Sequence, residues 1–363
     1  MAPKNTVRLT VSVEDIDSVA AQQAIIQAAQ VLRGGGTVAF PTETVYGLGA
    51  NALDAQAVEG IFLAKQRPAW DPLIVHVSDT AMVHRVVSHI SKRAQHLIDA
   101  FWPGPLTLLL LKQDAVPSVV TAGRTLVGVR MPAHPVAHAL IAAAGVPLAA
   151  PSANRFGHTS ATTAQHVLDD LDGRIDLLLD AGATQCGVES TVVEVGKEGI
   201  ILYRPGAIAA AEIEAIAGPV VLYQAPTQLP DSSQAANRPE SLPSPGVGIR
   251  HYAPNAEVLP VDVGFAPEVG QQGRWLRAVR EQRTRQLRVG VMLPWGWPLP
   301  EDFSGVQFAW GNWHSDQVLA QRLFAGLRAL DAMGAELILC PMPSSAGLGA
   351  ALQDRLLKAA RAE

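Results

Sequence analysis

The chain has 363 residues, of which 48% are hydrophobic and 17% are charged, and its 28 basic and 33 acidic side chains give a formal net charge of −5. This length predicts roughly two folded domains, and the composition excludes an intrinsically disordered chain. The negative net charge argues against an extended nucleic-acid-binding surface as the main function.

The apolar pattern argues against membrane insertion and secretion. The longest apolar stretches, such as the one at 108–111, fall far short of the ~20 residues that a transmembrane helix needs. The first fifteen residues alternate apolar and polar side chains and lack the apolar core of a signal peptide. Cys186 and Cys340 are too far apart for a CxxC-type metal site, and two cysteines exclude a disulfide framework. We therefore expect a cytoplasmic protein without membrane contact.

Helices and strands alternate through the first part of the chain. Residues 16–33 show helical spacing of apolar side chains, with Asp15 as the expected N-cap and Gly34 as the end. Further helices are predicted at 54–64, 79–88, 91–101, 135–144, 162–170 and 210–217, and strands at 37–40, 73–77, 106–111, 126–129, 147–150, 176–179, 191–195 and 200–203. Some of these strands are joined by helices and others by short turns, so the pattern predicts a mixed α/β sheet.

A composition change marks the domain boundary. Residues 224–245 are rich in Pro, Ser, Gln and Asn, which is typical of a linker. We therefore predict a first domain at 1–223, a linker at 224–255 and a small second domain at 256–363. In the second domain, strands at 257–263, 288–294 and 335–341 alternate with helices at 267–283, 315–333 and the chain end, which predicts an open three-layer α/β fold.

Nucleotide-binding motifs are weak. No Walker A sequence is present, because the Gly196-Lys197 pair is followed by Glu198 and lacks the upstream glycine pattern. The segment 47–52 (GLGANA) fits a relaxed dinucleotide-binding form but lies several residues beyond its strand. A tight turn is the simpler interpretation, since glycine permits positive φ. A third interpretation is a ligand site, because residues 41–47 (PTETVYG) place two hydroxyls and a carboxylate directly after a buried strand.

Basic side chains end several predicted elements. Lys65 and Arg67 follow the second predicted helix, where such residues often only complement the helix dipole. Here a scarce lysine is paired with an arginine, and this pair suits a polyphosphate ligand. Arg130 and Arg204 each end a strand, where a buried charge requires a partner. His76 also ends a strand and would, by itself, more often be a hydrogen-bonded core histidine than a ligand.

Small polar side chains follow the same pattern. Ser152 and Asn154 come directly after the strand at 147–150, and Ser190 comes directly before the strand at 191–195. Ser152 could act as a nucleophile with His158 as its base, but no G-x-S-x-G elbow surrounds it, so hydrogen bonding to a ligand is the favoured role. Together with the four cationic side chains, these groups predict a pocket for a phosphorylated ligand and a second small polar one.

Seven blocks of sequence carry a resemblance to a known family. They are PTETVYGLG at 41–49, KQRP at 65–68 with PLIVH at 72–76, WPGPLT at 102–107, VRMP at 129–132, PSAN at 151–154, EST at 189–191 and RPG at 204–206. In this order they resemble the YrdC-like domain of threonylcarbamoyl-adenylate synthases. Downstream, PG at 245–246 and HYAP at 251–254 are similar to the linker of the long form of that family. The resemblance implies a YrdC-like mixed α/β catalytic domain followed by a small Rossmann-like α/β domain.

The resemblance also implies an activity. The enzyme would be a nucleotidyltransferase that combines L-threonine, bicarbonate or CO2, and ATP into L-threonylcarbamoyl-adenylate with release of pyrophosphate. The product would serve the N6-threonylcarbamoyladenosine modification of tRNA, passing to a tRNA threonylcarbamoyl-transferase complex. Mg2+ would accompany ATP, without dedicated metal ligands in the chain. The alternative functions are a related carbamoyl-transferring maturation factor, a non-catalytic RNA-binding module and a dinucleotide oxidoreductase, and weak tRNA binding stays open.

Residue roles are implied in the same way. The catalytic residues would be Lys65, Arg67, Ser152 and Asn154. ATP would be bound by Arg67, Asp71, Leu126, Ser152, Ser160, Arg204 and Tyr252. L-threonine would be bound by Thr44, His76, Arg130, Ala150 and Ser190. Tyr252 would fold back over the nucleotide as a lid that excludes water.

Three positions depart from the family pattern or stay ambiguous. Ala150 stands where relatives often carry a hydroxyl, so a side-chain contact is lost there. Gly248-Ile249-Arg250 precedes the HYAP segment where basic and aromatic residues are more usual, so the contacts that such residues would give the lid are not expected here. Asp71 near Arg67 has two interpretations, a Mg2+ contact or an ion pair with a base.

Overall fold

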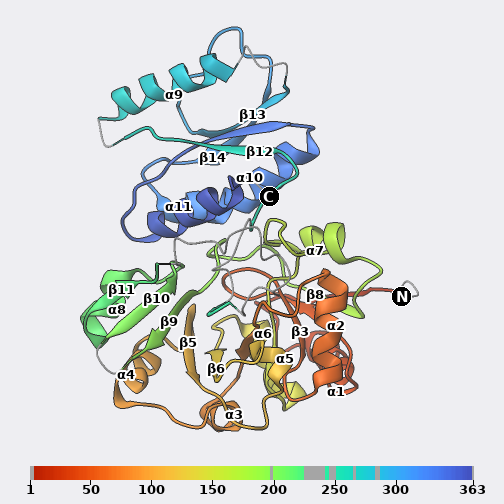
Figure 1. Cartoon of the computed structure of the whole chain (residues 1–363). Helices are drawn as coiled ribbons and strands as arrows, with labels where there is room; N and C mark the ends of the chain where they lie inside the picture. The colour runs from red at the N-terminus through yellow and green to blue at the C-terminus, as the bar shows by residue number, and fades with distance from the viewer. Residues whose placement is uncertain are drawn as a thin grey trace, which may run out of the picture.

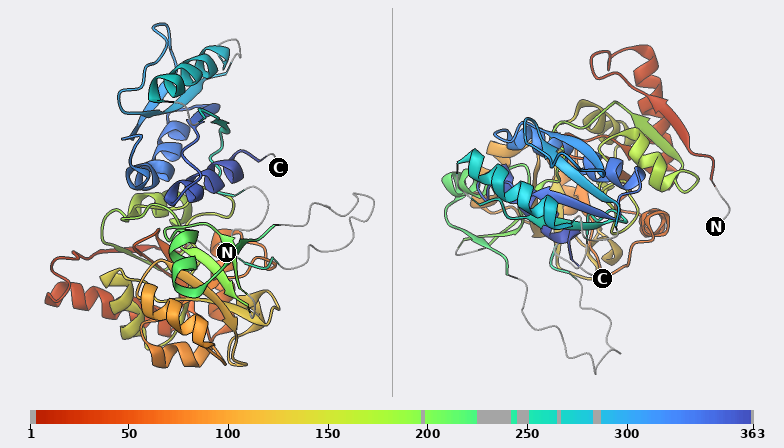
Figure 2. Two further views of the ribbon diagram at one scale, coloured as in Figure 1. Left: turned by 90° about the vertical axis from the view of Figure 1, so that its left-hand side faces the viewer. Right: turned by 90° about the horizontal axis from the view of Figure 1, so that it is seen from above.

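The computed structural model describes residues 4–196, 199–224, 242–244, 251–264, 267–282 and 287–361. Two β-sheets with their covering helices make up this part of the chain, a large one in the first domain and a smaller one in the second (Figure 1). The two further views in Figure 2 show the smaller domain stacked on one side of the larger. None of the described helices combines the length and the apolar character needed to cross a membrane.

The first domain is built on a mixed sheet. Its elements are β1 (Val7–Thr10), α1 (Val19–Arg33), β2 (Val38–Phe40), β3 (Gly47–Asn51), α2 (Ala55–Lys65), β4 (Ile74–His76), α3 (Thr80–Val86), α4 (Lys92–Phe101), β5 (Leu106–Leu111), α5 (Ser118–Thr121), β6 (Leu126–Arg130), α6 (Pro135–Ala144), β7 (Leu148–Ala149), α7 (Ala164–Leu171), β8 (Leu177–Asp180), β9 (Thr191–Val195), β10 (Ile200–Arg204), α8 (Ala210–Ala217) and β11 (Val220–Leu222). The strands lie in the order β1-β8-β2-β3-β7-β4-β6-β5-β9-β10-β11. β6 pairs in parallel with β4 and antiparallel with β5, so the predicted mixed sheet is confirmed.

Capping residues decide where the helices begin and end. Ser18 Oγ accepts a hydrogen bond from Ala21 N at 3.3 Å, so α1 begins at Val19, and the expected cap at Asp15 was one turn too early. Gln66 ends α2 in the left-handed conformation, at φ 55°. The chain therefore changes direction sharply at Gln66, and the side chains of Lys65 and Arg67 lie on different sides of that bend.

Strand β3 corrects the first two interpretations of the GLGANA segment. Residues 47–49 pair antiparallel with β2, and a Cβ atom added at Gly49 would lie 2.7 Å from Cε1 of Phe40. Glycine is required at 49 because an aromatic ring covers the strand, and Gly47 and Gly49 lie in the strand and not in a turn. The dinucleotide-binding interpretation is wrong as well, since that motif needs its glycines at a strand-to-helix turn.

The second domain contains a parallel sheet. Its elements are β12 (Glu257–Val261), α9 (Glu268–Gln282), β13 (Val289–Pro294), β14 (Val306–Gly311), α10 (Asp316–Ala332), β15 (Leu337–Pro341) and α11 (Leu348–Ala359). The strands lie in the order β12-β15-β13-β14, all parallel. In Figure 1, α9 covers one face of this sheet, and α10 and α11 cover the face toward the first domain. The predicted three-layer arrangement is confirmed, although β14 was not predicted.

The two domains meet through packed helices and ion pairs. The hydrophobic core around α10 and α11 continues into side chains of the first domain. Arg328 of α10 pairs with Asp170 of α7 at 2.6 Å, and Arg355 of α11 pairs with Glu189, just before β9, at 2.7 Å. These buried contacts fix the second domain over the strand ends of the first.

The predicted linker falls mostly outside the described residues. β11 ends at Leu222 and β12 begins at Glu257, and only short pieces between them are described. The domain boundaries therefore stay predictions. The segment Gly248-Ile249-Arg250 also lies outside the described residues.

Candidate active site

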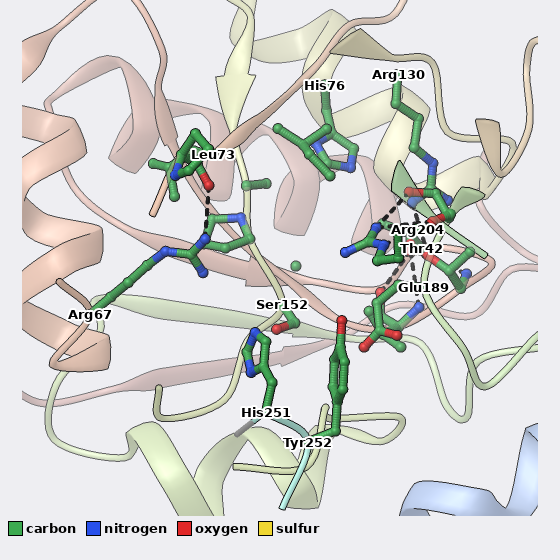
Figure 3. Close-up of a pocket in the computed structure, with 18 residues that line it drawn as sticks. Thr42, Arg67, Leu73, His76, Arg130, Ser152, Glu189, Arg204, His251 and Tyr252 are labelled. Carbon is green, nitrogen blue, oxygen red and sulfur yellow. Dashed lines mark hydrogen bonds between the residues drawn. The ribbon is translucent and has the colours of Figure 1, made fainter. Parts of the chain in front are cut away.

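Several strand ends of the first domain converge on one pocket (Figure 3). Its walls come from the loop between β2 and β3, the chain after α2, the ends of β4, β6, β7 and β10, and the start of β9. The lining residues are Thr42, Thr44, Val45, Gly47, Arg67, Pro72, Leu73, Ile74, His76, Arg130, Ala150, Pro151, Ser152, Glu189, Ser190, Arg204, His251 and Tyr252. Strand ends are where open α/β sheets bind ligands, so the pocket is a candidate active site.

Most of the predicted site residues line this pocket. They are Thr44, Arg67, His76, Arg130, Ala150, Ser152, Ser190, Arg204 and Tyr252. The others that were predicted do not: Lys65, Asp71, Leu126, Asn154 and Ser160 lie behind the lining or away from it.

Arg130 forms a rigid cationic corner of the pocket. Its Nη2 lies 2.7 Å from Glu43 Oε1, its Nη1 donates to Thr44 Oγ1 at 2.9 Å, and its Nε donates to the carbonyl oxygen of Gly104 at 3.2 Å. Burial alone would raise the pKa of Glu43, but the charge of Arg130 holds it below its usual value. Both groups are therefore ionised, and the guanidinium is held in one orientation.

His76 is a neutral histidine next to that corner. Burial, together with the nearby charge of Arg130, lowers the pKa of His76 to about 3. Its ring meets Phe40 edge-on, with the ring centroids 6.3 Å apart, and its Nδ1 is buried without a partner among the described residues. The imidazole therefore offers a hydrogen bond to a ligand without carrying charge.

Arg67 and Asp71 form a buried ion pair on the opposite wall. Arg67 Nη2 lies 2.9 Å from Asp71 Oδ2 and donates to the carbonyl oxygen of Pro72 at 2.8 Å. Burial lowers the pKa of Arg67 and raises that of Asp71, and the attraction between them opposes both shifts. Of the two interpretations of Asp71, the structure therefore favours the ion pair. Asp71 orients Arg67 and does not itself line the pocket.

Lys65 and Asn154 lie behind the loop that carries Ser152. The Lys65 ammonium donates to the carbonyl oxygens of Ser152 and Asn154, and burial, followed by the charge of Arg67, lowers the pKa of Lys65 well below its usual value. The Asn154 amide donates to the carbonyl oxygens of Arg155 and His158 at 2.7 and 2.8 Å. In this structure both residues hold the loop in place, so their contact with the pocket is indirect.

Two predicted ATP-binding residues are placed elsewhere. Ser160 Oγ donates to Glu189 Oε1, so its hydroxyl is already engaged behind the lining. Leu126 begins β6 opposite Leu111, four residues from Arg130 and thus about 13 Å along the strand. The structure does not bring Leu126 to the pocket.

Arg204 and Ser190 form a polar cluster at the ends of β10 and β9. Arg204 donates to the carbonyl oxygen of Ser190 through Nε and Nη2, at 3.1 and 3.0 Å, and to its Oγ at 3.1 Å. The hydroxyls of Ser190 and Thr107 share a hydrogen bond at 2.8 Å. No carboxylate among the described residues pairs with Arg204, so its charge is available to an anionic ligand.

Tyr252 and His251, in the last part of the predicted linker, cover the pocket. Their rings stack at 4.4 Å, and Tyr252 also stacks on Phe324 of α10 at 5.8 Å. Ala253 N donates to the carbonyl oxygen of Gly157 at 2.9 Å, which ties the segment to the first domain. Burial raises the pKa of Tyr252 to about 12, so the phenol is neutral. Figure 3 shows its hydroxyl directed into the pocket, between Ser152 and Glu189.

Two family models match the chain. One, described as Telomere recombination, matches residues 30–206, and one, described as Threonylcarbamoyl-AMP synthase, C-terminal domain, matches residues 208–361. The threonylcarbamoyl-AMP synthase of Pyrococcus abyssi is 40% identical over 334 residues, 92% of each chain. The one of Bacillus subtilis is 40% identical over 342 residues, 93% of this chain and 92% of the relative. The chain belongs to the threonylcarbamoyl-AMP synthase family.

A solved structure of this synthase family has the same two-domain fold. Pyrococcus abyssi Sua5, in a crystal structure described as complexed with L-threonine, matches with a TM-score of 0.85 and 37% identity, over 98% of this chain and 98% of that one. The predicted fold class, a mixed α/β domain followed by a smaller α/β domain, is thereby confirmed.

Two acidic residues of the site have no role predicted from the sequence: Glu189, which lines the pocket, and Glu43, which pairs with the lining residue Arg130. In the sequence, Glu43 is a carboxylate after a predicted strand and Glu189 is part of the EST block. The signal for Glu43 was its position beside a buried strand end, where a carboxylate needs a cation. For Glu189 no signal existed, because its partner Arg355 lies 166 positions away in the other domain.

Proposed function

We propose that this chain is an enzyme, a nucleotidyltransferase that joins L-threonine, bicarbonate or CO2, and ATP into L-threonylcarbamoyl-adenylate and releases pyrophosphate. The observation that carries the proposal is one covered pocket that has arginine side chains in separate places. Arg130 is paired with Glu43 at one corner, and Arg67 and Arg204 line other walls of the pocket. Relatives named threonylcarbamoyl-AMP synthase support the same activity.

The corner at Arg130 suits the amino-acid substrate. The carboxylate of L-threonine would pair with Arg130, which Glu43 and Thr44 hold in one orientation. His76 and Ser190 offer hydrogen bonds to the remaining polar groups, and Ala150 contributes only an apolar surface. Because His76 is neutral, it adds no positive charge next to a substrate amine that must act as a nucleophile.

Arg67, Arg204 and Ser152 are the residues we assign to the nucleotide phosphates. Arg204 lacks a carboxylate partner in the described part of the chain, and a forked guanidinium matches phosphate oxygens. Lys65 acts through the loop that presents Ser152, by holding its backbone carbonyl. No group of three or more His, Cys, Asp or Glu side chains among the described residues is arranged to hold a metal ion, so we propose that Mg2+ arrives with ATP and is held by the phosphates.

The chemistry then needs positioning more than covalent assistance. The threonine amine adds to CO2 and releases a proton, which gives a carbamate. A carbamate oxygen attacks the α-phosphorus of ATP in line, and the bond to the leaving pyrophosphate breaks as the new P–O bond forms. Held cations neutralise the charge, and the Tyr252–His251 cover excludes water that would hydrolyse the adenylate. We propose that the adenylate is consumed by a tRNA threonylcarbamoyl-transferase complex.

The test is pyrophosphate release from ATP with L-threonine and bicarbonate supplied together and then each omitted. The proposal expects release only when both are present, with an adenylate product of matching stoichiometry. Release that continues without threonine would indicate a simple ATP hydrolase. No release from a folded protein that binds ATP would overturn the proposed synthase activity.

A further inference from the structure

Helix α11 of the second domain contributes a buried arginine to the wall behind the pocket. The side chain of Arg355 is completely buried. Its Nε lies 2.7 Å from Glu189 Oε2, and its guanidinium carbon lies 4.9 Å from the centre of the Tyr252 ring. Glu189 and Tyr252 both line the pocket. One side chain of the second domain therefore contacts a fixed wall and the cover of the site at the same time.

The guanidinium is itself held in place by its own helix. Arg355 Nη1 lies 2.5 Å from the Asp354 carboxylate, which also accepts a hydrogen bond from Lys358 at 2.8 Å. Arg355 Nη2 is buried and has no hydrogen-bond partner within the described ranges. This arrangement leaves little freedom of movement, because a buried guanidinium with charged partners on two sides has one favourable orientation.

Arg355 is the strongest of the groups that keep Glu189 charged. Burial alone would raise the pKa of Glu189, but Arg355, followed by Arg204 and the Ser160 hydroxyl, lowers it below its usual value. The carboxylate is thus ionised, and it holds Ser160 through its other oxygen. Without Arg355, Glu189 would lose its paired cation in a buried place, and its favourable orientation against Ser160 would be lost with it.

We infer that Arg355 is a positioning residue for the reaction: it holds Tyr252 over the pocket and Glu189 in its wall, so that the site is complete only when the second domain is docked. The inference rests on the proposed function for its kinetic consequences. Its structural part, that α11 fastens the cover, does not depend on which reaction takes place.

The chain offers a matched control for the docking itself. Arg328 of α10 forms a second ion pair between the domains, 2.6 Å from Asp170, and donates to the carbonyl oxygen of Thr159. Neither Arg328 nor Asp170 lines the pocket. Removing Arg328 therefore weakens the same interface without touching the cover, whereas removing Arg355 affects both.

The experiment compares full-length Arg355→Met, Arg355→Lys and Arg328→Met with the parent. For Arg355→Met we expect the KM for ATP to rise about 10-fold or more, with the KM for L-threonine changed less than about 3-fold, and a shorter lifetime of the bound adenylate. Arg355→Lys should recover part of the loss, since it keeps the charge. Arg328→Met should lower the unfolding temperature while leaving the ratio of the two KM values unchanged.

Two readouts do not require turnover. Calorimetric binding of a non-hydrolysable ATP analogue should weaken in Arg355→Met, and backbone amide exchange at residues 251–253 should become faster, with Arg328→Met close to the parent in both. If Arg355→Met and Arg328→Met behave alike in affinity and exchange, the positioning role is wrong. If the parent releases no pyrophosphate but these two differences appear, the proposed reaction fails and the inference about Arg355 stands. Should Arg355→Met not fold, Arg355→Gln, which also removes the charge, takes its place in the comparison.

Discussion

Glu43 Oε1 lies 2.7 Å from Arg130 Nη2, and the two side chains are only 7% and 5% exposed. A buried ion pair adds little net stability, because the attraction is offset by the loss of hydration. Its value lies in orientation, because the carboxylate fixes a guanidinium that lines the pocket. Arg130 comes from the end of β6 and Glu43 from the loop after β2, so the corner exists only when both strands are in the sheet.

Replacing Glu43 with glutamine should therefore damage threonine binding selectively. The amide keeps the shape but no longer fixes the charge of Arg130, so we expect the KM for L-threonine to rise roughly 10-fold or more, with the KM for ATP changed much less. Steady-state pyrophosphate release with each substrate varied in turn measures both values. The exposed Glu59→Gln on α2 is the control. Equal losses for both substrates would contradict the role of Glu43.

The neutral state of His76 predicts a pH dependence of stability. Its pKa is about 3 when folded and near 6.5 when unfolded, because burial disfavours the protonated form. The unfolded chain therefore binds the proton more readily, so this contribution is complete above pH 6.5 and is lost as the pH falls toward 3, by about 1.4 kcal/mol per pH unit. His76→Gln should show a weaker loss of unfolding free energy between pH 6.5 and 4.5, measured with urea. The exposed His84→Gln should follow the parent.

Arg67 and Asp71 allow stability and activity to be separated. Arg67→Met should reduce pyrophosphate release by about 100-fold or more, because a cation assigned to the phosphates is lost. It should also lower the unfolding free energy, on the order of 3 kcal/mol, since Asp71 is left buried and unpaired. The double variant Arg67→Met with Asp71→Asn should recover much of the stability and none of the activity. If activity returned with stability, Arg67 would have only a structural role.

Two substitutions of Tyr252 should differ in their effect on activity, because only one of them keeps the aromatic ring that covers the pocket. Tyr252→Phe keeps the ring that stacks on His251 and Phe324, and should retain most of the activity. Tyr252→Ala removes it, so we expect weaker retention of ATP and several-fold faster hydrolysis of the adenylate. Rapid quenching and chromatography of the product give its lifetime. Identical lifetimes in Tyr252→Ala and the parent would contradict a covering role.

The sequence predicted most of the fold because the alternation of helices and strands is a local signal. It did not predict β3, since Gly47 and Gly49 have no side chains that favour a strand, and only the ring of Phe40 explains the glycine at 49. It placed the start of α1 at Asp15 because Asp15 and Ser18 are both good caps, and only the hydrogen bond to Ala21 distinguishes them.

The sequence predicted which residues belong to the candidate site, but not which of their side chains face the pocket. Motif blocks named Arg67, Arg130 and Ser152, which line the pocket, but the same blocks named Lys65 and Asn154, which lie behind it. A sequence block does not say on which side of a loop a side chain lies. Contacts between the domains, such as Arg355 with Glu189, depend on the docking of two separate cores, for which one sequence carries no local signal.

Gly187 allows the closeness of the contact between the two domains to be tested. It has φ 74°, and a Cβ atom there would lie 2.3 Å from the carbonyl oxygen of Ala320 on α10. Gly182 has a similar φ of 82° with nothing within 4 Å of its Cβ position, so Gly182→Ala isolates the backbone strain, about 1 kcal/mol. Gly187→Ala should lose roughly 2 kcal/mol more, because the second domain must move away.

The same pair of variants tests whether docking reaches the active site. A displaced α10 carries α11 with it, since the two helices pack together, so the KM for ATP should rise in Gly187→Ala and stay at the parent value in Gly182→Ala. Denaturant unfolding and substrate kinetics on both variants make the comparison. Equal destabilisation in the two would mean that the interface yields at Gly187 without strain. If the position of the second domain shapes the pocket, a loss of stability and a rise in the KM for ATP must appear together in Gly187→Ala. A larger loss of stability with an unchanged KM for ATP would therefore mean that the pocket does not depend on docking.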